Sequence, residues 1–194
     1  MYYKNHFKRI FDFTFALLLV IAMALPMLAI AILIRVTSQG DALFRQTRYT
    51  LYSRPFTIYK FRTMVVGTPE IANQEFKDRE SYETKFGSFL RKTSLDELPQ
   101  IINVLKGEMS FIGPRPLAIT DKYVLKQRRD SGADSVRPGI SGLAQVRGRN
   151  EISDDAKAMY DKEYAEKVTL SMDIYILAST LVNVVRQTGI NKKT

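Results

Sequence analysis

Cysteine is absent from the chain, and histidine occurs once, at His6. The lack of cysteine excludes disulfides and thiolate metal sites, and it leaves the redox compartment undetermined. A single histidine near the N-terminus gives no basis for histidine-based catalysis or for a histidine-rich metal cluster. Catalysis must therefore rely on Asp, Glu, Lys, Arg, Tyr, Ser or Thr. Any bound metal would take oxygen ligands, which favours a hard cation such as Mg²⁺.

Acidic residues are fewer than basic ones: the chain has 20 Asp and Glu and 29 Lys and Arg, which gives a formal net charge of +9. Such an excess favours anionic partners, and nucleic acid, anionic lipid and phosphorylated small molecules all qualify. With 194 residues, the chain fits one domain, or one domain with a small appendage, and it is long enough to bury a core.

Charge is missing altogether from residues 13–34, "FTFALLLVIAMALPMLAIAILI". As a straight helix this segment would be about 33 Å long, roughly the thickness of the hydrocarbon layer. A single spanning helix and a signal peptide are two interpretations. Pro26 interrupts the segment, and basic residues flank both of its ends. These two features favour a third, a re-entrant helix-break-helix that turns at Pro26 and returns to the same face.

The rest of the chain has the pattern of a folded domain, so we expect a membrane hairpin over residues 1–36 and a folded domain over residues 37–194. Alternating residues in 41–64 predict a β-hairpin that turns around residues 52–55. Helices are predicted over 95–106, which ends at Gly107, over 153–167, and over 170–187, while the glycine-rich stretch 132–150 is expected to be a loop. The predicted fold class is α+β and predominantly helical. The amphipathic helix 170–187 would cover the core or lie at the membrane interface.

Two adjacent carboxylates, Asp96 and Glu97, begin the predicted helix over 95–106. A purely structural interpretation is available, because Ser94 and Glu97 have the spacing of a capping box. Alternatively, Asp96 is the N-cap, which places Pro99 in the first turn, where proline costs little.

A functional interpretation starts from the same position. A helix N-terminus favours negative charge, so a carboxylate held there stays ionised and can act as a nucleophile if cations neutralise the phosphate that it approaches. Arg91, Lys92 and Arg115 supply such cations, and Pro114 and Pro116 stiffen the backbone around Arg115. A divalent cation at Asp96 would bring a phosphoryl group to the carboxylate. The residues thus suggest phosphoryl transfer at a membrane surface.

Three motifs resemble a known family, in the order in which that family has them. They are "YKFRTM" at 59–64, "FLRKTSLDELPQIINVLKGEMSFIGPRP" at 89–116 and "VRPGISGLAQVRGRN" at 136–150. The chain resembles the monotopic phosphoglycosyl transferases of the bacterial sugar transferase family, of the small single-domain type. The resemblance covers nearly the whole chain, and the middle motif is long and specific.

The resemblance implies a reaction and its machinery. Such enzymes transfer a sugar-1-phosphate from a UDP-sugar to polyprenyl phosphate, usually undecaprenyl phosphate, release UMP, and use Mg²⁺. A ping-pong mechanism would run through a phosphosugar on Asp96, which would also lie near the metal, with Glu97 as its partner. The implied phosphate contacts are Arg91, Arg115 and Arg137; the implied nucleotide or lipid-phosphate contacts are Lys60, Arg62, Gln145 and Arg149.

The resemblance also implies a place in the cell. The first helix would be re-entrant, broken near Pro26, and anchored on the cytoplasmic face of the bacterial inner membrane. Three positions depart from the family pattern: Leu25 replaces a common serine, Thr50 a common glycine, and Arg147 a common asparagine. Without the serine hydroxyl, Leu25 cannot satisfy a backbone carbonyl freed at the break.

Two other functions compete with the transferase. A membrane-tethered nucleic-acid-binding module would suit the basic charge, but no recognition motif supports it, so no nucleic-acid partner is expected. A catalytically inactive scaffold is argued against by the presence of Asp96, Glu97, Arg91 and Arg115. The expected partners are therefore the two substrates and membrane lipids, while the sugar, the pathway and any homo-oligomer stay open.

Overall fold

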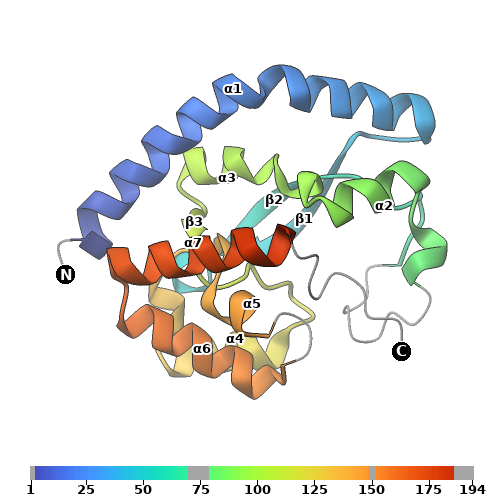
Figure 1. Ribbon diagram of the computed structural model, residues 1–194. Helices are drawn as coiled ribbons and strands as arrows, with labels where there is room; N and C mark the ends of the chain where they lie inside the picture. Colours follow the sequence, from blue (N-terminus) through green and yellow to red (C-terminus); the bar gives the residue numbers. More distant parts are fainter. Residues whose placement is uncertain (1–2, 70–78, 149–151, 186–194) are drawn as a thin grey trace.

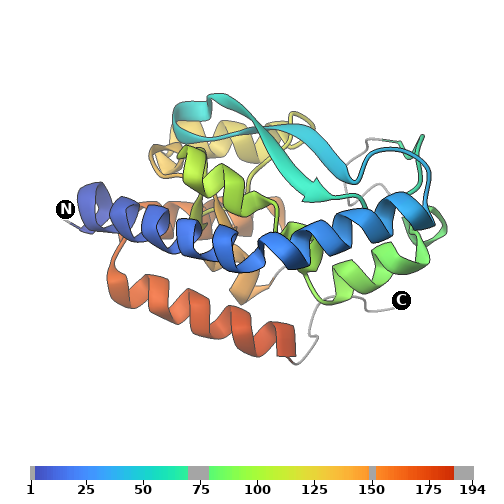
Figure 2. The ribbon, with the colours of Figure 1, turned by 90° about the horizontal axis from the view of Figure 1, so that it is seen from above.

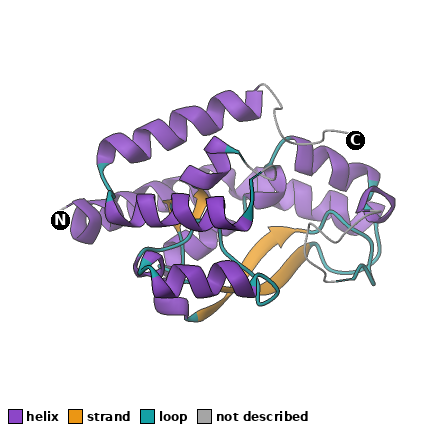
Figure 3. Cartoon of the chain, turned by 90° about the horizontal axis from the view of Figure 1, so that it is seen from below, coloured by secondary structure: helices purple, strands orange, loops and turns teal. Residues whose placement is uncertain are grey.

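The computed structural model describes residues 3–69, 79–148 and 152–185, and helices dominate it (Figures 1 and 3). This confirms a predominantly helical α+β fold with a long apolar first helix. The helices are α1 (Lys8–Thr37), α2 (Lys85–Lys92), α3 (Gln100–Lys106), α4 (Lys122–Asp130), α5 (Leu143–Arg147), α6 (Asp154–Glu166) and α7 (Leu170–Val185). The strands are β1 (Leu43–Tyr49), β2 (Pro55–Phe61), β3 (Ser110–Ile112) and β4 (Gly139–Ser141).

The predicted hairpin is confirmed. Strands β1 and β2 pair antiparallel from Leu43↔Phe61 to Tyr49↔Pro55, and a short 3-10 turn at Leu51–Ser53 joins them. The side chain of Asn103 on α3 fixes β2 in place. Its amide nitrogen donates to the Thr57 carbonyl at 2.7 Å, and its amide oxygen accepts the Tyr59 N–H at 3.1 Å. Because both bonds are to the backbone of β2, the strand, including Lys60, has a fixed position relative to α3.

The helix predicted over 95–106 is two elements. A 3-10 turn at Leu95–Glu97 comes first, and α3 begins only after Pro99, which lacks the N–H that a helix interior would need. The predicted end at Gly107 is confirmed. Gly107 has a φ of 80°, in the left-handed region that glycine adopts at little cost, and its N–H bonds back to the Val104 carbonyl.

The predicted break at Pro26 differs from the structure, because α1 is helical from Lys8 to Thr37 with Pro26 inside it. A proline in a helix removes one backbone hydrogen bond and bends the helix, but it does not oblige the helix to end. Figure 1 shows the result as an arch that passes over the rest of the molecule. Helix α1 is long and apolar enough to cross a membrane by length and composition, and only 6% of its most apolar window is buried.

Both ends of α1 contact the same folded domain. Near its start, Arg9 donates to the carbonyls of Val104 and Leu105 at 2.6 and 3.0 Å, at the end of α3. Near its end, Ile34 packs in a small core with Phe61 of β2 and Leu90 of α2. The middle of the helix is far more exposed, with Leu25 78% accessible. The arch therefore rests on the domain at both ends and presents apolar side chains between them. Seen from above, α1 runs across almost the full width of the molecule (Figure 2).

The glycine-rich stretch predicted as a loop contains ordered structure instead. Strand β4 pairs in parallel with β3, and α5 follows it. The strands approach so closely that a Cβ on Gly139 would lie 2.1 Å from the Gly113 nitrogen. Two of the glycines that suggested a loop, Gly139 and Gly142, are thus required by tight backbone packing against Gly113. Behind them lies a core cluster of buried residues formed by Ile112, Leu143, Tyr164 and Ile176.

Candidate active site

The Asp96–Glu97 pair lies in the 3-10 turn between α2 and α3. Ser94, immediately before the turn, has a φ of 58° and a ψ of 15°, and its side chain caps no helix. The capping-box interpretation is therefore wrong, and so is Asp96 as N-cap, because Pro99 takes that position on α3. A non-glycine residue in the left-handed region carries strain of roughly 1–3 kcal/mol, which the surrounding packing must maintain. Neither carboxylate is therefore used to cap a helix.

Glu97 forms an ion pair with Lys60 of β2, with 2.7 Å between Oε1 and Nζ. Burial by itself raises the pKa of Glu97, but the charges of Lys60 and Arg115 and hydrogen bonds with Lys60 and Gln100 lower it below its usual value. Glu97 is consequently ionised at neutral pH, and it holds the Lys60 ammonium beside the turn.

Asp96 has the opposite shift. Burial, and then the neighbouring charge of Glu97, raises its pKa from 3.8 to about 6, although Lys60, Arg91 and Arg115 act in the other direction. Its carboxylate makes no hydrogen bond or ion pair with any residue in the described ranges. Asp96 is therefore an uncommitted carboxylate within the influence of three cations, which is the arrangement expected of a nucleophile that must approach a phosphate.

The charges of Arg91 and Arg115 act on this carboxylate from different elements. Arg91, on α2, is held by Glu83 at 2.8 Å and by the Thr63 hydroxyl at 2.9 Å. Arg115 has an exposed side chain and follows β3 in the Pro-Arg-Pro segment. Its backbone carbonyl accepts a hydrogen bond from Arg128 at 2.9 Å, and Arg128 pairs at 2.6 Å with Asp161. A buried ion pair between α4 and α6 thus holds the backbone that carries Arg115.

Of the remaining predicted contacts, Gln145 shares a cavity with Glu97, whereas Arg62 and Arg137 bond to other parts of the fold. Gln145 lines a cavity of about 270 Å³ that also includes Glu97 and Ser94. Arg62 donates to the carbonyl and hydroxyl of Ser38, at 3.1 and 2.8 Å. Arg137 donates to the Gly107 carbonyl at 2.8 Å, beyond the other end of α3. Arg149 lies outside the described residues.

The three departures from the family pattern have distinct surroundings. Leu25 is exposed on the arch, beside Pro26. The Thr50 hydroxyl donates to the Glu108 carbonyl next to the hairpin turn. Arg147 forms a two-fold ion pair with Glu163 at 2.6 and 3.1 Å and lies over the Tyr160 ring. Arg147 therefore fastens α5 to α6.

Sequence reasoning missed Ser94, Arg128 and Asp161. No sequence signal marks Ser94, because its importance lies in a backbone conformation that serine rarely adopts. Arg128 and Asp161 are 33 residues apart, so only the fold shows that they meet.

The pair offers few groups for a metal. Within the described residues there is no cluster of three or more His, Cys, Asp or Glu that could hold an ion by itself. Mg²⁺, however, often takes only one or two carboxylates and completes its coordination with substrate phosphates and water. Asp96, without a hydrogen-bond partner in this part of the chain, and the adjacent Glu97 fit that mode of binding.

Comparisons with known proteins find relatives over almost the whole chain. Residues 3–187 match the family model described as bacterial sugar transferase. The sugar transferase EpsL of Bacillus subtilis, described as uncharacterized, is 38% identical over 185 residues, which cover 95% of this chain and 90% of that protein. A UDP-glucose:undecaprenyl-phosphate glucose-1-phosphate transferase of Caulobacter vibrioides is 38% identical over 90% of this chain and 68% of its own length.

The Escherichia coli protein with the same activity name is 36% identical over 90% of this chain, but the match spans only 39% of that protein. The match to the family model and the similarity to EpsL nevertheless extend over almost the whole of the present chain. The chain therefore belongs to the bacterial sugar transferase family.

Proposed function

We propose that this protein transfers a sugar-1-phosphate from a UDP-sugar to undecaprenyl phosphate and releases UMP, with Asp96 as the nucleophile. The observation that carries the proposal is the uncommitted Asp96 carboxylate, whose pKa is about 6, beside Lys60, Arg91 and Arg115. At neutral pH this carboxylate is mostly ionised. The three cations stabilise the negative charge of the diphosphate that it must approach.

The reaction divides into two displacements. In the first, an Asp96 oxygen attacks the β-phosphorus of the UDP-sugar, and the bond from that phosphorus to the bridging oxygen breaks, so that UMP leaves. In the second, an oxygen of the lipid phosphate attacks the same phosphorus, and the bond to Asp96 breaks. A Mg²⁺ ion held by Asp96, with Glu97 beside it, would neutralise charge on the diphosphate. Glu97 keeps Lys60 in place, and Arg115 is free to contact phosphate.

The membrane arrangement follows from the arch. A helix that spanned a bilayer would leave its two ends on opposite sides, yet both ends of α1 contact one folded domain. We therefore infer that α1 enters and leaves on the same, cytoplasmic face of the inner membrane. The cavity that adjoins Glu97 is lined by Leu19 of α1 and by residues of α7, and most of its lining is apolar. The first isoprene units of the acceptor would fit there, with the phosphate at the dyad.

The sugar is a narrower question. Relatives in Escherichia coli and Caulobacter vibrioides are named for glucose, and one in Salmonella typhimurium is an undecaprenyl-phosphate galactose phosphotransferase. UDP-glucose and UDP-galactose are therefore the first donors to test, and UDP-N-acetylhexosamines extend the panel.

The test is intact-protein mass spectrometry on purified protein with Mg²⁺, one UDP-sugar at a time and no acceptor. We expect a mass increase of one sugar phosphate with the correct donor. Asp96→Asn should give no adduct, while Asp130→Asn, an exposed aspartate on α4, should give the wild-type result.

The other outcomes are equally informative. UMP release that requires the lipid phosphate and proceeds without any adduct would replace the two-step mechanism by direct transfer. Full turnover by Asp96→Asn would refute Asp96 as the nucleophile. No adduct and no UMP with any donor would contradict the proposed activity.

A further inference from the structure

A second cavity lies at the start of α1, away from the Asp96–Glu97 pair. It has a volume of about 290 Å³ and shares no lining residue with the cavity at Glu97. Its wall combines the first turns of α1, the turns at Leu51–Ser53 and Ala133–Ser135, and the segment before β4. Arg9 and Arg137, which line it, bond to backbone carbonyls at the C-terminal end of α3. The Asp96–Glu97 pair instead precedes the N-terminal end of this helix. The seven residues of α3 separate the two places by about 10 Å or more.

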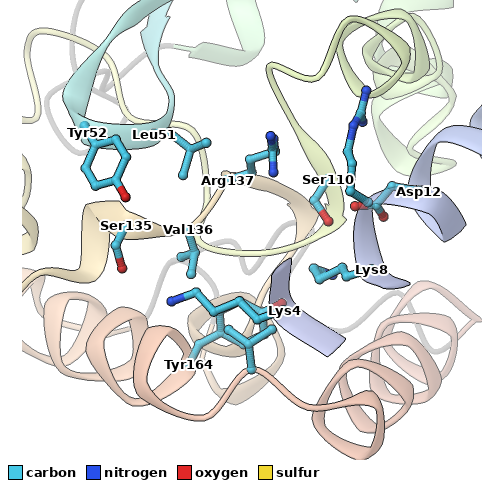
Figure 4. A pocket seen from close by; sticks show the side chains of 12 residues that line it. Lys4, Lys8, Asp12, Leu51, Tyr52, Ser110, Ser135, Val136, Arg137 and Tyr164 are labelled. Atoms are coloured by element: carbon cyan, nitrogen blue, oxygen red, sulfur yellow. The ribbon is translucent and has the colours of Figure 1, made fainter. Parts of the chain in front are cut away.

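Four cations line this cavity, and one carboxylate opposes them. The cations are Lys4, Lys8, Arg9 and Arg137, and the carboxylate is Asp12. Figure 4 shows Arg137 and Lys4 on facing walls, with Tyr52 and Ser135 at one end and Asp12 and Ser110 at the other. The hydroxyl groups of Tyr52 and Ser135 are additional hydrogen-bond donors, whereas the Ser110 hydroxyl bonds to Asp12.

Two of these cations, Lys8 and Arg9, are already bonded to other groups of the protein. Lys8 is neutralised by Asp173 at 2.5 Å. Arg9 donates both terminal nitrogens to carbonyls at the end of α3. Asp12 faces the cavity but also accepts the Phe111 N–H at 3.3 Å. These contacts anchor α1, and they leave the charge of Arg9 without a carboxylate partner in this part of the chain.

The other two cations, Arg137 and Lys4, have N–H groups that are available to a ligand. Arg137 uses Nε for the Gly107 carbonyl, and its two terminal nitrogens have no partner within the described ranges. Lys4 makes a single long contact, 3.4 Å from its ammonium to the Ala165 carbonyl. A guanidinium with a free fork is suited to the tetrahedral oxygens of a phosphate, and a nearby ammonium adds a point charge.

We propose that this cavity is a second anion site, which binds a phosphate group between Lys4 and Arg137. The phosphate comes from one of two sources, the headgroup of an anionic phospholipid or a soluble phosphate compound. The position favours the headgroup, because exposed Phe7, Ile10 and Phe11 lie on the same first turns of the membrane helix. A headgroup bound there would fix the depth of α1 in the bilayer and would take no part in the transfer chemistry.

The experiment compares the wild-type protein with Lys4→Gln/Arg137→Gln and with Lys126→Gln, which removes an exposed charge of α4 that lines neither cavity. In one arm, detergent-purified protein is mixed with phosphatidylglycerol or phosphatidylcholine, and retained lipid is counted by native mass spectrometry. In the other arm, inorganic phosphate is titrated and the thermal midpoint is followed. Lys4→Gln is a milder single variant, because Lys4 makes only one contact, in case the double variant does not fold.

We expect the wild-type protein and Lys126→Gln to retain one phosphatidylglycerol more than the double variant, with affinity reduced about tenfold or more by loss of charged hydrogen bonds. Stabilisation by inorganic phosphate that the double variant lacks, without preferential lipid retention, would identify a soluble phosphate as the ligand. Equal binding by all proteins in both arms would overturn the site. Asp96→Asn should bind like the wild-type protein, so the result is independent of the proposed transfer reaction.

Discussion

Asp96 and Glu97 are adjacent in the chain, yet their pKa values shift in opposite directions. Glu97 has Lys60 as a direct partner, whereas Asp96 has burial and a negative neighbour. Ionisation of Asp96 therefore lowers the free energy of unfolding. Such a cost is common where a group must react, because a fully satisfied carboxylate would be a poor nucleophile.

This cost predicts how stability changes with pH. The pKa of Asp96 is about 6 in the folded protein and 3.8 in the reference state, so its ionisation disfavours folding as the pH rises between these values. Asparagine has no such penalty. Asp96→Asn should therefore raise the thermal midpoint at neutral pH, and the gain should shrink as the pH falls through 6 toward 4. An equal gain at every pH would contradict the shift, and Asp130→Asn is the control.

The same pKa predicts the acid limb of activity. If Asp96 must be ionised, kcat/KM should fall below pH 6. Glu97→Gln removes a charge that raises the pKa of Asp96, so it should move this limb to lower pH. Lys60→Met removes a charge that lowers it, so it should move the limb to higher pH. Profiles measured from about pH 5 to 9 test both signs, and shifts in the same direction would refute the electrostatic account.

The sequence predicted Asp96 and Glu97 as the candidate pair, but not how the basic residues are distributed. The motifs identified Asp96, Glu97, Arg91 and Arg115, and the structure brings these four together. Arg137 belongs to the third motif that carries the resemblance, yet it lies beyond the other end of α3. Motif order along the chain does not reveal which end of a short helix a distant loop will reach.

Among the elements, α4 and α6 hold the Pro-Arg-Pro segment through Arg128 and Asp161. The side chains of Arg128 and Asp161 are 8% and 2% exposed. Arg128→Met should leave Asp161 buried without a partner and cost about 3–5 kcal/mol in the free energy of unfolding. It should also raise the KM for the UDP-sugar, because the Arg115 carbonyl loses its donor.

The double variant Arg128→Met/Asp161→Leu separates these two effects. Replacing both charges by apolar groups should recover most of the stability, since no charge is left unpaired. The raised KM should persist, because the Arg115 carbonyl still lacks its hydrogen bond. Denaturant titration and steady-state kinetics test the two parts, and full recovery of KM would show that Arg128 does not position Arg115.

Helix α1 offers a direct test of membrane arrangement, helped by the absence of native cysteine. Single cysteines at Lys4 and Thr37 should both react with a membrane-impermeant reagent in inside-out vesicles and resist it in intact cells. A cysteine at Lys126 on α4 reports the side of the domain. Labelling of the two helix ends from opposite sides would establish a spanning helix and exclude the re-entrant arrangement.

Elements with strong local signals were predictable, and elements that depend on distant partners were not. Ser153 begins α6 as expected, and its hydroxyl accepts the Ala156 N–H at 3.2 Å. Strands β3 and β4 have three residues each, and glycines in their vicinity imitate a loop. The continuity of α1 through Pro26 could not be predicted from local sequence either, because a proline is compatible with a bend in the helix or with a break.

At the scale of the whole molecule, two kinds of surface face the surroundings. The net charge of +9 attracts anionic lipid, while α1 and α7 present exposed apolar side chains such as Ile21 and Leu181. Salt at about 1 M shortens the screening length to about 3 Å and should remove the electrostatic part of membrane binding. We expect the protein to stay with the membrane fraction in such a wash and to be released by detergent. Release by salt alone would mean that the apolar surface is not inserted.

The contacts of the first turns of α1 also have a consequence for the order of synthesis. Tyr3 and Lys8 bond to Asp173, which is 170 and 165 residues further along the chain, and Arg9 bonds to Val104, 95 residues further. A ribosome completes these partners long after α1 has emerged. The contacts that join the start of α1 to the rest of the fold can therefore form only after most of the residues that follow this helix have been made. Helix α1 is completed early and is among the last elements to be locked in place.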